Sequence, residues 1–137
     1  MSSALVVEDD SANMKLTTLF LHSAGHSVLS AVDAETGLRV AHDEQPDLIL
    51  MDIQLPGMDG LVATAILKED PDTARIPIVA LSALAMKADE ERSQTAGCDA
   101  YIVKPLRYKE LYAVMERLLQ EPPPPATRAA SPNVPPT

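Results

Sequence analysis

Short apolar runs alternate along the chain with longer stretches in which apolar residues recur every three or four positions. The short runs predict five strands, at Ala4–Val7, Ser27–Ala31, Asp47–Met51, Ile78–Leu81 and Ala100–Val103. The third run contains the unbroken apolar sequence LILM at residues 48–51. A run without polar alternation is typical of a strand covered on both faces, as in a parallel sheet.

The longer stretches predict five helices, at Ser11–Ala24, Ala34–His42, Gly60–Lys68, Met86–Ala96 and Tyr108–Gln120. The last stretch places apolar residues at the i, i+3, i+4, i+7 spacing of one helix face. The stretch that begins at Met86 is mostly polar or charged, so we expect it to be the least firmly docked helix. Ser11 is the candidate N-cap of the first helix, and Asp59 is expected to stabilise the start of the third.

The order of these elements predicts an α/β fold. Strand–helix alternation gives a parallel sheet, and right-handed crossovers limit how the helices can cover it. We therefore expect a doubly wound, five-stranded parallel sheet with helices on both faces. The sequence LPG at residues 55–57 predicts a loop after the third strand, because proline fixes φ and glycine tolerates unusual backbone angles. Asp52 then ends a central strand, at the edge where open α/β sheets bind ligands.

Composition divides the chain into a folded domain, residues 1–121, and a tail, residues 122–137. The tail contains seven of the 12 prolines and no acidic residue. Such a segment cannot bury a core, so we expect it to be flexible and locally extended. A proline-rich recognition peptide is the alternative interpretation of the tail.

The charge and hydropathy of the chain narrow the class of protein. Its net charge of −9 opposes nonspecific nucleic-acid binding, which relies on clustered basic residues. The sequence offers neither the ~20-residue apolar run of a membrane-spanning helix nor the basic start of a signal peptide. A single cysteine, Cys98, allows no intrachain disulfide and fits a reducing compartment. We expect a cytoplasmic protein that contacts neither membrane nor nucleic acid directly.

The polar residues that follow the predicted strands form the candidate site. Parallel strands bring their carboxyl ends to one edge, which here gathers Glu8, Asp9, Asp10, Asp52, Ser82 and Lys104. Close carboxylates repel one another and need a cation. Oxygen ligands without nearby His or Cys favour Mg²⁺. With Mg²⁺ and Lys104 to offset phosphoryl charge, Asp52 is the candidate nucleophile that forms an acyl phosphate.

Four motifs carry a family resemblance: VVEDD, DLILMDIQLPGMDG, IVALSA and AYIVKP. In this order and spacing, residues 4 to 120 resemble the response-regulator receiver domain of two-component signalling, the CheY-like family. The segments VVEDDSANMKL and SALAMKADEERSQTAGCDAYI are most similar to stand-alone receivers that govern bacterial cell division and differentiation. The resemblance implies a flavodoxin-like sheet with strand order 2-1-3-4-5. It also implies a regulator that catalyses only its own phosphorylation and slow dephosphorylation, and is not otherwise an enzyme.

The resemblance implies how phosphorylation takes place. Asp52 would accept a phosphoryl group from a phosphohistidine on a sensor histidine kinase or a histidine phosphotransfer protein. Asp9 and Asp10, together with Asp52 and the backbone carbonyl of Gln54, would hold Mg²⁺. Glu8 is expected to lie outside this ligand set.

The resemblance also implies how the phosphoryl group is sensed. Ser82, the amide of Ala83 and Lys104 would bind it, and the bond between Lys104 and Pro105 would be cis. Ser82 and Tyr101 would move inward and remodel the face formed by the fourth helix, fifth strand and last helix. A downstream protein effector would recognise that face. Exposed parts of the last helix are compatible with a homodimer, and no effector domain is expected after the receiver.

By the same resemblance, Gln54 and Leu84 would flank the path of the water that hydrolyses the acyl phosphate. Leu84 can neither orient nor deprotonate a water molecule, so we expect self-dephosphorylation to be slow.

Two other functions are compatible with parts of the pattern. A Mg²⁺-dependent phosphatase would typically have a second acid at position 54, and a docking module with a receiver fold would act without phosphorylation.

The three histidines, His22, His26 and His42, lack clustered spacing along the sequence. We expect them at the surface or at helix ends, without a role in the chemistry. Cys98 follows a helix-ending glycine and is expected to serve packing.

Overall fold

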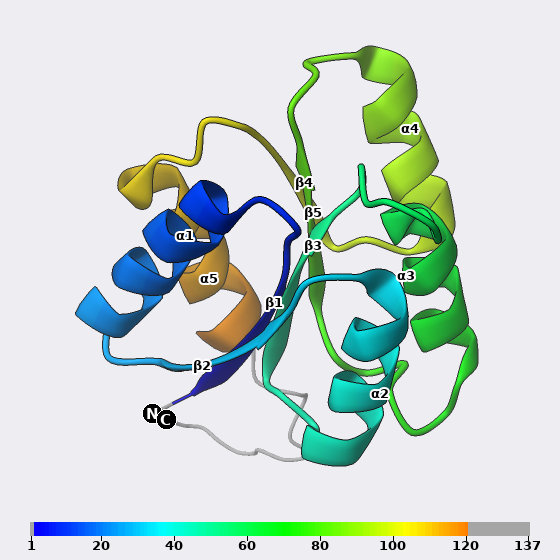
Figure 1. Ribbon diagram of the computed structural model, residues 1–137, viewed down its shortest axis with the longest axis horizontal. Helices are drawn as coiled ribbons and strands as arrows, with labels where there is room; N and C mark the ends of the chain where they lie inside the picture. The colour runs from blue at the N-terminus through cyan, green and yellow to red at the C-terminus, as the bar shows by residue number, and fades with distance from the viewer. Residues whose placement is uncertain (1, 121–137) are drawn as a thin grey trace.

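The computed structural model describes residues 2–120 and shows a three-layer α/β architecture (Figure 1). Its elements are β1 (Ser3–Val7), α1 (Ser11–Ser23), β2 (Ser27–Ala31), α2 (Ala34–Glu44), β3 (Leu48–Asp52), α3 (Gly60–Glu69), β4 (Ile78–Ser82), α4 (Lys87–Ala96), β5 (Ala100–Val103) and α5 (Tyr108–Gln120). Helices α1 and α5 cover one face of the sheet, and α2, α3 and α4 cover the other. The proline-rich tail expected at residues 122–137 lies outside the described residues.

The sheet is entirely parallel, with strand order β2-β1-β3-β4-β5. The predicted fold class and strand order are therefore confirmed. All five residues of β3 are buried, as its unbroken apolar sequence requires. Ile49 and Met51 pack in the core cluster beneath α2 and α3, whereas Leu48 and Leu50 pack in the cluster beneath α1 and α5.

The helices differ in how firmly they are held. On α5, Leu111 and Met115 are buried in the core, in line with its strong apolar face. On α4, Ser93 is the single buried residue of the ten from Lys87 to Ala96. The weak docking expected for this helix agrees with that exposure. Within residues 2–120, none of the helices has the length and apolar character needed to cross a bilayer.

Several element ends differ from the expectation by one or two residues, and one difference changes a residue's role. The N-cap of α1 is Asp10, not Ser11, because the Asp10 carboxylate accepts a hydrogen bond from the Ala12 amide at 2.9 Å. At the start of α3, Asp59 is the N-cap, as predicted, and accepts from the Leu61 amide at 2.7 Å.

Candidate functional site

Asp52 is the last residue of β3, and the sheet holds it at its carboxyl edge. The side chain is almost completely buried, although it bears a carboxylate. Its Oδ1 accepts a hydrogen bond from the Gln54 amide at 2.9 Å, and its Oδ2 accepts one from Lys104 Nζ at 3.0 Å. The loop after β3 therefore fixes one oxygen, and an ammonium group from beyond β5 neutralises the other.

Lys104 connects two buried carboxylates, those of Asp52 and Glu8. Its Nζ lies 2.9 Å from Glu8 Oε1, where the angles give an ion pair rather than an aligned hydrogen bond. Burial raises the pKa of Glu8, and the nearby Asp52 carboxylate acts in the same direction. Burial opposes the charge on Lys104, yet pairing with Glu8 and Asp52 holds the pKa of Lys104 above its ordinary value.

The backbone beside Lys104 is also anchored. Its amide donates to the Ser82 carbonyl at 2.7 Å, which ties the end of β5 to the end of β4. The peptide bond between Lys104 and Pro105 is cis, as expected from the sequence. These backbone features fix the residue whose Nζ lies 3.0 Å from Asp52 Oδ2.

Three acids gather at this edge: Glu8, Asp9 and Asp52 each offer a carboxylate oxygen, and these oxygens lie within 4.8 Å of one another. A set of hard oxygen donors at this spacing suits a divalent cation such as Mg²⁺. The residues therefore fit the expected metal, but the set differs from the expected one. The carboxylate of Asp10 is held at the N-terminus of α1, where it also accepts from Asn13 Nδ2 at 3.3 Å.

The inclusion of Glu8 was missed by sequence reasoning, although a signal was present. Glu8 and Asp9 directly follow Val7, the last residue of β1, whereas Asp10 directly precedes a helix. An acid immediately before a helix is a favoured N-cap, so Asp10 was the member of the run to set apart. Glu8 also accepts a hydrogen bond from the Asp10 amide at 3.2 Å through its Oε2.

The hydroxyl groups of Ser82 and Tyr101 meet at the backbone of Leu84. Ser82 Oγ donates to the Leu84 carbonyl at 2.9 Å and accepts from the Leu84 amide at 3.1 Å. Tyr101 Oη donates to the same carbonyl at 3.0 Å. The two candidate switch residues are thus joined through one acceptor.

The amide of Ala83, expected to bind a phosphoryl oxygen, donates to Gln54 Oε1 at 3.3 Å. This contact connects the loop after β3 to the loop after β4. The Gln54 side chain thereby occupies a donor that a phosphoryl group would need. The Leu84 side chain is half-exposed beside it.

The chain is similar to known receiver domains over most of its length. Residues 4–116 match the response regulator receiver domain family. The polar-differentiation response regulator DivK of Brucella anthropi is 44% identical over 104 residues, which cover 76% of this chain and 85% of DivK.

Two solved structures have the same architecture. A receiver domain of a sensor histidine kinase from Pseudomonas aeruginosa, with a magnesium ion coordinated in its active-site cleft, has a TM-score of 0.81 and 34% identity. A putative response regulator from Chloroflexus aurantiacus has a TM-score of 0.83 and 29% identity. Each comparison covers 86% of this chain and 97% of the other chain. With its sheet order, its buried Asp52 and this match across all five strands, the chain belongs to the response-regulator receiver domain family.

Proposed function

We propose that this protein is a phosphoacceptor of a two-component or phosphorelay system, acting in the cytoplasm. The observation that carries the proposal is the buried Asp52 carboxylate, which is held between Lys104 and the acidic group formed with Glu8 and Asp9. The phosphoryl donor is a phosphohistidine on a sensor histidine kinase or a histidine phosphotransfer protein. Catalysis is confined to the protein's own phosphorylation and dephosphorylation.

In the proposed reaction, an oxygen of Asp52 attacks the phosphorus atom. The phosphorus–nitrogen bond of the donor breaks, and the imidazole leaves with the electron pair. Lys104, already at Asp52, pairs with the phosphoryl oxygens. Glu8, Asp9 and Asp52 would hold Mg²⁺, with the Gln54 carbonyl as the expected further ligand, and the ion would offset the charge of the phosphoryl group.

Ser82 would connect phosphorylation of Asp52 to a change at the protein surface. To bond a phosphoryl oxygen, its hydroxyl must give up its two contacts with the Leu84 backbone. The Leu84 carbonyl also holds Tyr101, so a change at Ser82 alters the loop that fixes the tyrosine. The α4–β5–α5 face would then favour a different partner, either a protein effector or a second copy of the chain.

Acetyl phosphate tests the proposal, because it supplies a phosphoryl group without a kinase. With Mg²⁺ present, the intact mass should rise by one phosphoryl group. With EDTA, the gain should disappear, because Asp52 and its acidic neighbours would lack the cation that offsets the incoming charge. A folded protein that gains nothing from acetyl phosphate or from phosphorylated kinases would instead support a docking module without phosphorylation.

Leu84→Glu should shorten the life of the phosphorylated protein by roughly tenfold or more, because a carboxylate there can orient or deprotonate the attacking water. Ser82 and Tyr101 form their hydrogen bonds with backbone atoms of Leu84, so the substitution leaves these acceptors and donors in place. Decay of the phosphorylated mass after donor removal is the measurement. Met86→Glu, also at an exposed apolar residue, is the matched control and should not change the lifetime. An unchanged lifetime in Leu84→Glu would contradict the argument.

A further inference from the structure

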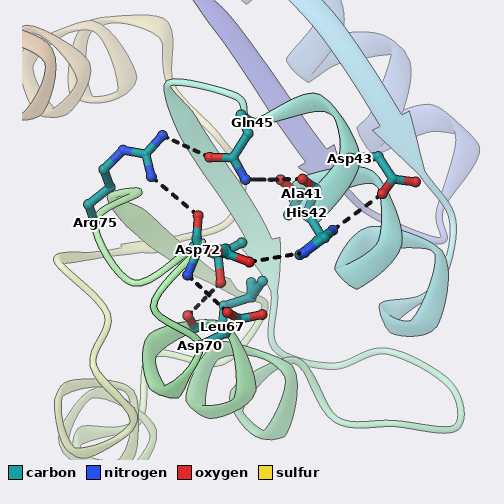
Figure 2. A network of polar contacts seen from close by, with 9 residues as sticks. Ala41, His42, Asp43, Gln45, Leu67, Asp70, Asp72 and Arg75 are labelled. Atoms are coloured by element: carbon teal, nitrogen blue, oxygen red, sulfur yellow. Dashed lines mark hydrogen bonds and ion pairs between the residues drawn. The ribbon is translucent and has the colours of Figure 1, made fainter.

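His42, Asp70 and Asp72 form a second cluster of ligand-type side chains (Figure 2). His42 is in the last turn of α2, Asp70 is the C-cap of α3, and Asp72 follows in the connection to β4. These segments lead into the amino ends of β3 and β4, whereas Asp52 lies at the carboxyl end. We propose that this amino-edge cluster of His42, Asp70 and Asp72 binds a divalent transition-metal ion of the zinc class.

The distances within the amino-edge cluster suit a single ion. Each residue offers one ligand atom, and the three atoms lie within 4.8 Å of one another. His42 Nε2 lies 3.3 Å from Asp72 Oδ2. Two ligand atoms in a tetrahedral site with bonds of about 2.0–2.1 Å are separated by about the same distance. An ion can therefore enter between His42 and Asp72 with little movement of either side chain.

A further contact orients the imidazole. His42 Nδ1 lies 3.3 Å from Asp43 Oδ1, so the neighbouring carboxylate can hold the proton on Nδ1 and leave Nε2 free to bind metal. Metal-bound histidines commonly have such a carboxylate on the other nitrogen.

The two segments that supply the ligands are already tied together (Figure 2). Arg75 donates to the Gln45 side chain at 2.7 Å and to the Asp72 carbonyl at 3.2 Å. Gln45 in turn donates to the His42 carbonyl at 3.0 Å. The Asp72 amide donates to Asp70 Oδ1 at 2.9 Å, which fixes that carboxylate and leaves its second oxygen available. The site is therefore largely formed before an ion arrives.

The ligand types select the metal. One imidazole and two carboxylates suit Zn²⁺ better than Mg²⁺, which prefers oxygen ligands alone. Three protein ligands leave at least one position for water. Bound there, the ion would connect the end of α2 to the α3–β4 connection and stabilise the folded chain by mass action.

Calorimetric titration of the full chain with Zn²⁺, in saturating Mg²⁺, tests this site. His42→Gln should weaken binding at one site by at least tenfold, because it removes the only nitrogen ligand. His22→Gln changes an exposed histidine in the last turn of α1 and should leave every site intact. Zn²⁺ bound at the carboxyl edge is unaffected by either variant, so their difference isolates the amino-edge cluster.

Nitrogen NMR of the imidazole rings provides an independent readout. One equivalent of Zn²⁺ should shift Nε2 of His42 and should do so less in Asp72→Asn. If His42→Gln binds the same number of ions with the same affinity as the unmodified chain, or if the His42 nitrogens do not shift, the cluster is a surface ion pair and the proposal is wrong.

Discussion

Asp52→Asn is expected to abolish phosphoryl incorporation from acetyl phosphate, with no gain in intact mass under conditions that phosphorylate the unmodified chain. An amide oxygen is a far weaker nucleophile than a carboxylate and cannot form a stable acyl phosphate. The substitution should leave the fold intact, because Lys104 keeps Glu8 as its partner at 2.9 Å. Circular dichroism of the variant checks that the fold is retained.

Asp59→Asn is the matched control for this experiment. Asp59 lies at the far end of the loop that follows Asp52, and its carboxylate caps α3 through the Leu61 amide. Asparagine caps helices about as well as aspartate, so the variant should fold and accept one phosphoryl group. A full mass gain in Asp52→Asn would place the acceptor on another residue, and a loss in Asp59→Asn would show that the assay reports loop geometry rather than the nucleophile.

Much of the fold could be predicted because it depends on local patterns. The unbroken apolar run that ends at Asp52 indicated a central parallel strand, and β3 is fully buried. Asp52 was expected at the end of its strand, but the predicted strand ranges stopped at Met51 and Leu81, one residue short of Asp52 and Ser82, because polar residues do not continue an apolar pattern. Asp52 and Ser82 are therefore positioned by the hydrogen bonds between strands and not by the loops that follow them.

The site was less predictable where it depends on how side chains share partners. Three consecutive acids follow β1, and the place of Asp10 just before a helix indicated a cap, but its hydrogen-bond partner could not be predicted from the sequence. The structure shows that partner, because the Ala12 amide donates to the Asp10 carboxylate at 2.9 Å. The contact between Gln54 and the Ala83 amide joins two loops that are distant in sequence, and no local pattern reports it.

The amino-edge cluster was even harder to predict from the sequence than the site around Asp52. The expectation that the histidines have no clustered partners rested on spacing along the chain. His42 contacts Asp72 because the end of α2 lies beside the α3–β4 connection. The hydrogen bond between Arg75 and Gln45 holds these two segments together. Such proximity follows from tertiary packing, so the sequence could not show it.

Gly60→Ala is expected to destabilise the fold by about 3 kcal/mol, because no space exists for a side chain at the start of α3. A Cβ at this position would overlap the backbone carbonyl oxygen of Asp52 and approach Cα of Ile53 to 2.8 Å. Neither atom can rotate away. Either α3 or the end of β3 must move, so Asp52, the proposed phosphoacceptor, should also react more slowly. Urea unfolding and the rate of mass gain from acetyl phosphate measure the two effects.

Gly37→Ala, in α2, separates this backbone clash from a general effect of replacing a helical glycine. Its Cβ would lie 2.8 Å from a methyl group of Val7, which is a side-chain atom on an adjacent element and can shift slightly. Alanine also favours a helix interior over glycine by about 1 kcal/mol, which offsets part of the crowding. The Gly37 variant should therefore lose much less stability and keep its phosphorylation rate. Equal losses in the two variants would mean that contact with the β3 backbone does not position Asp52, and that its reactivity depends on Lys104 and the acidic group alone.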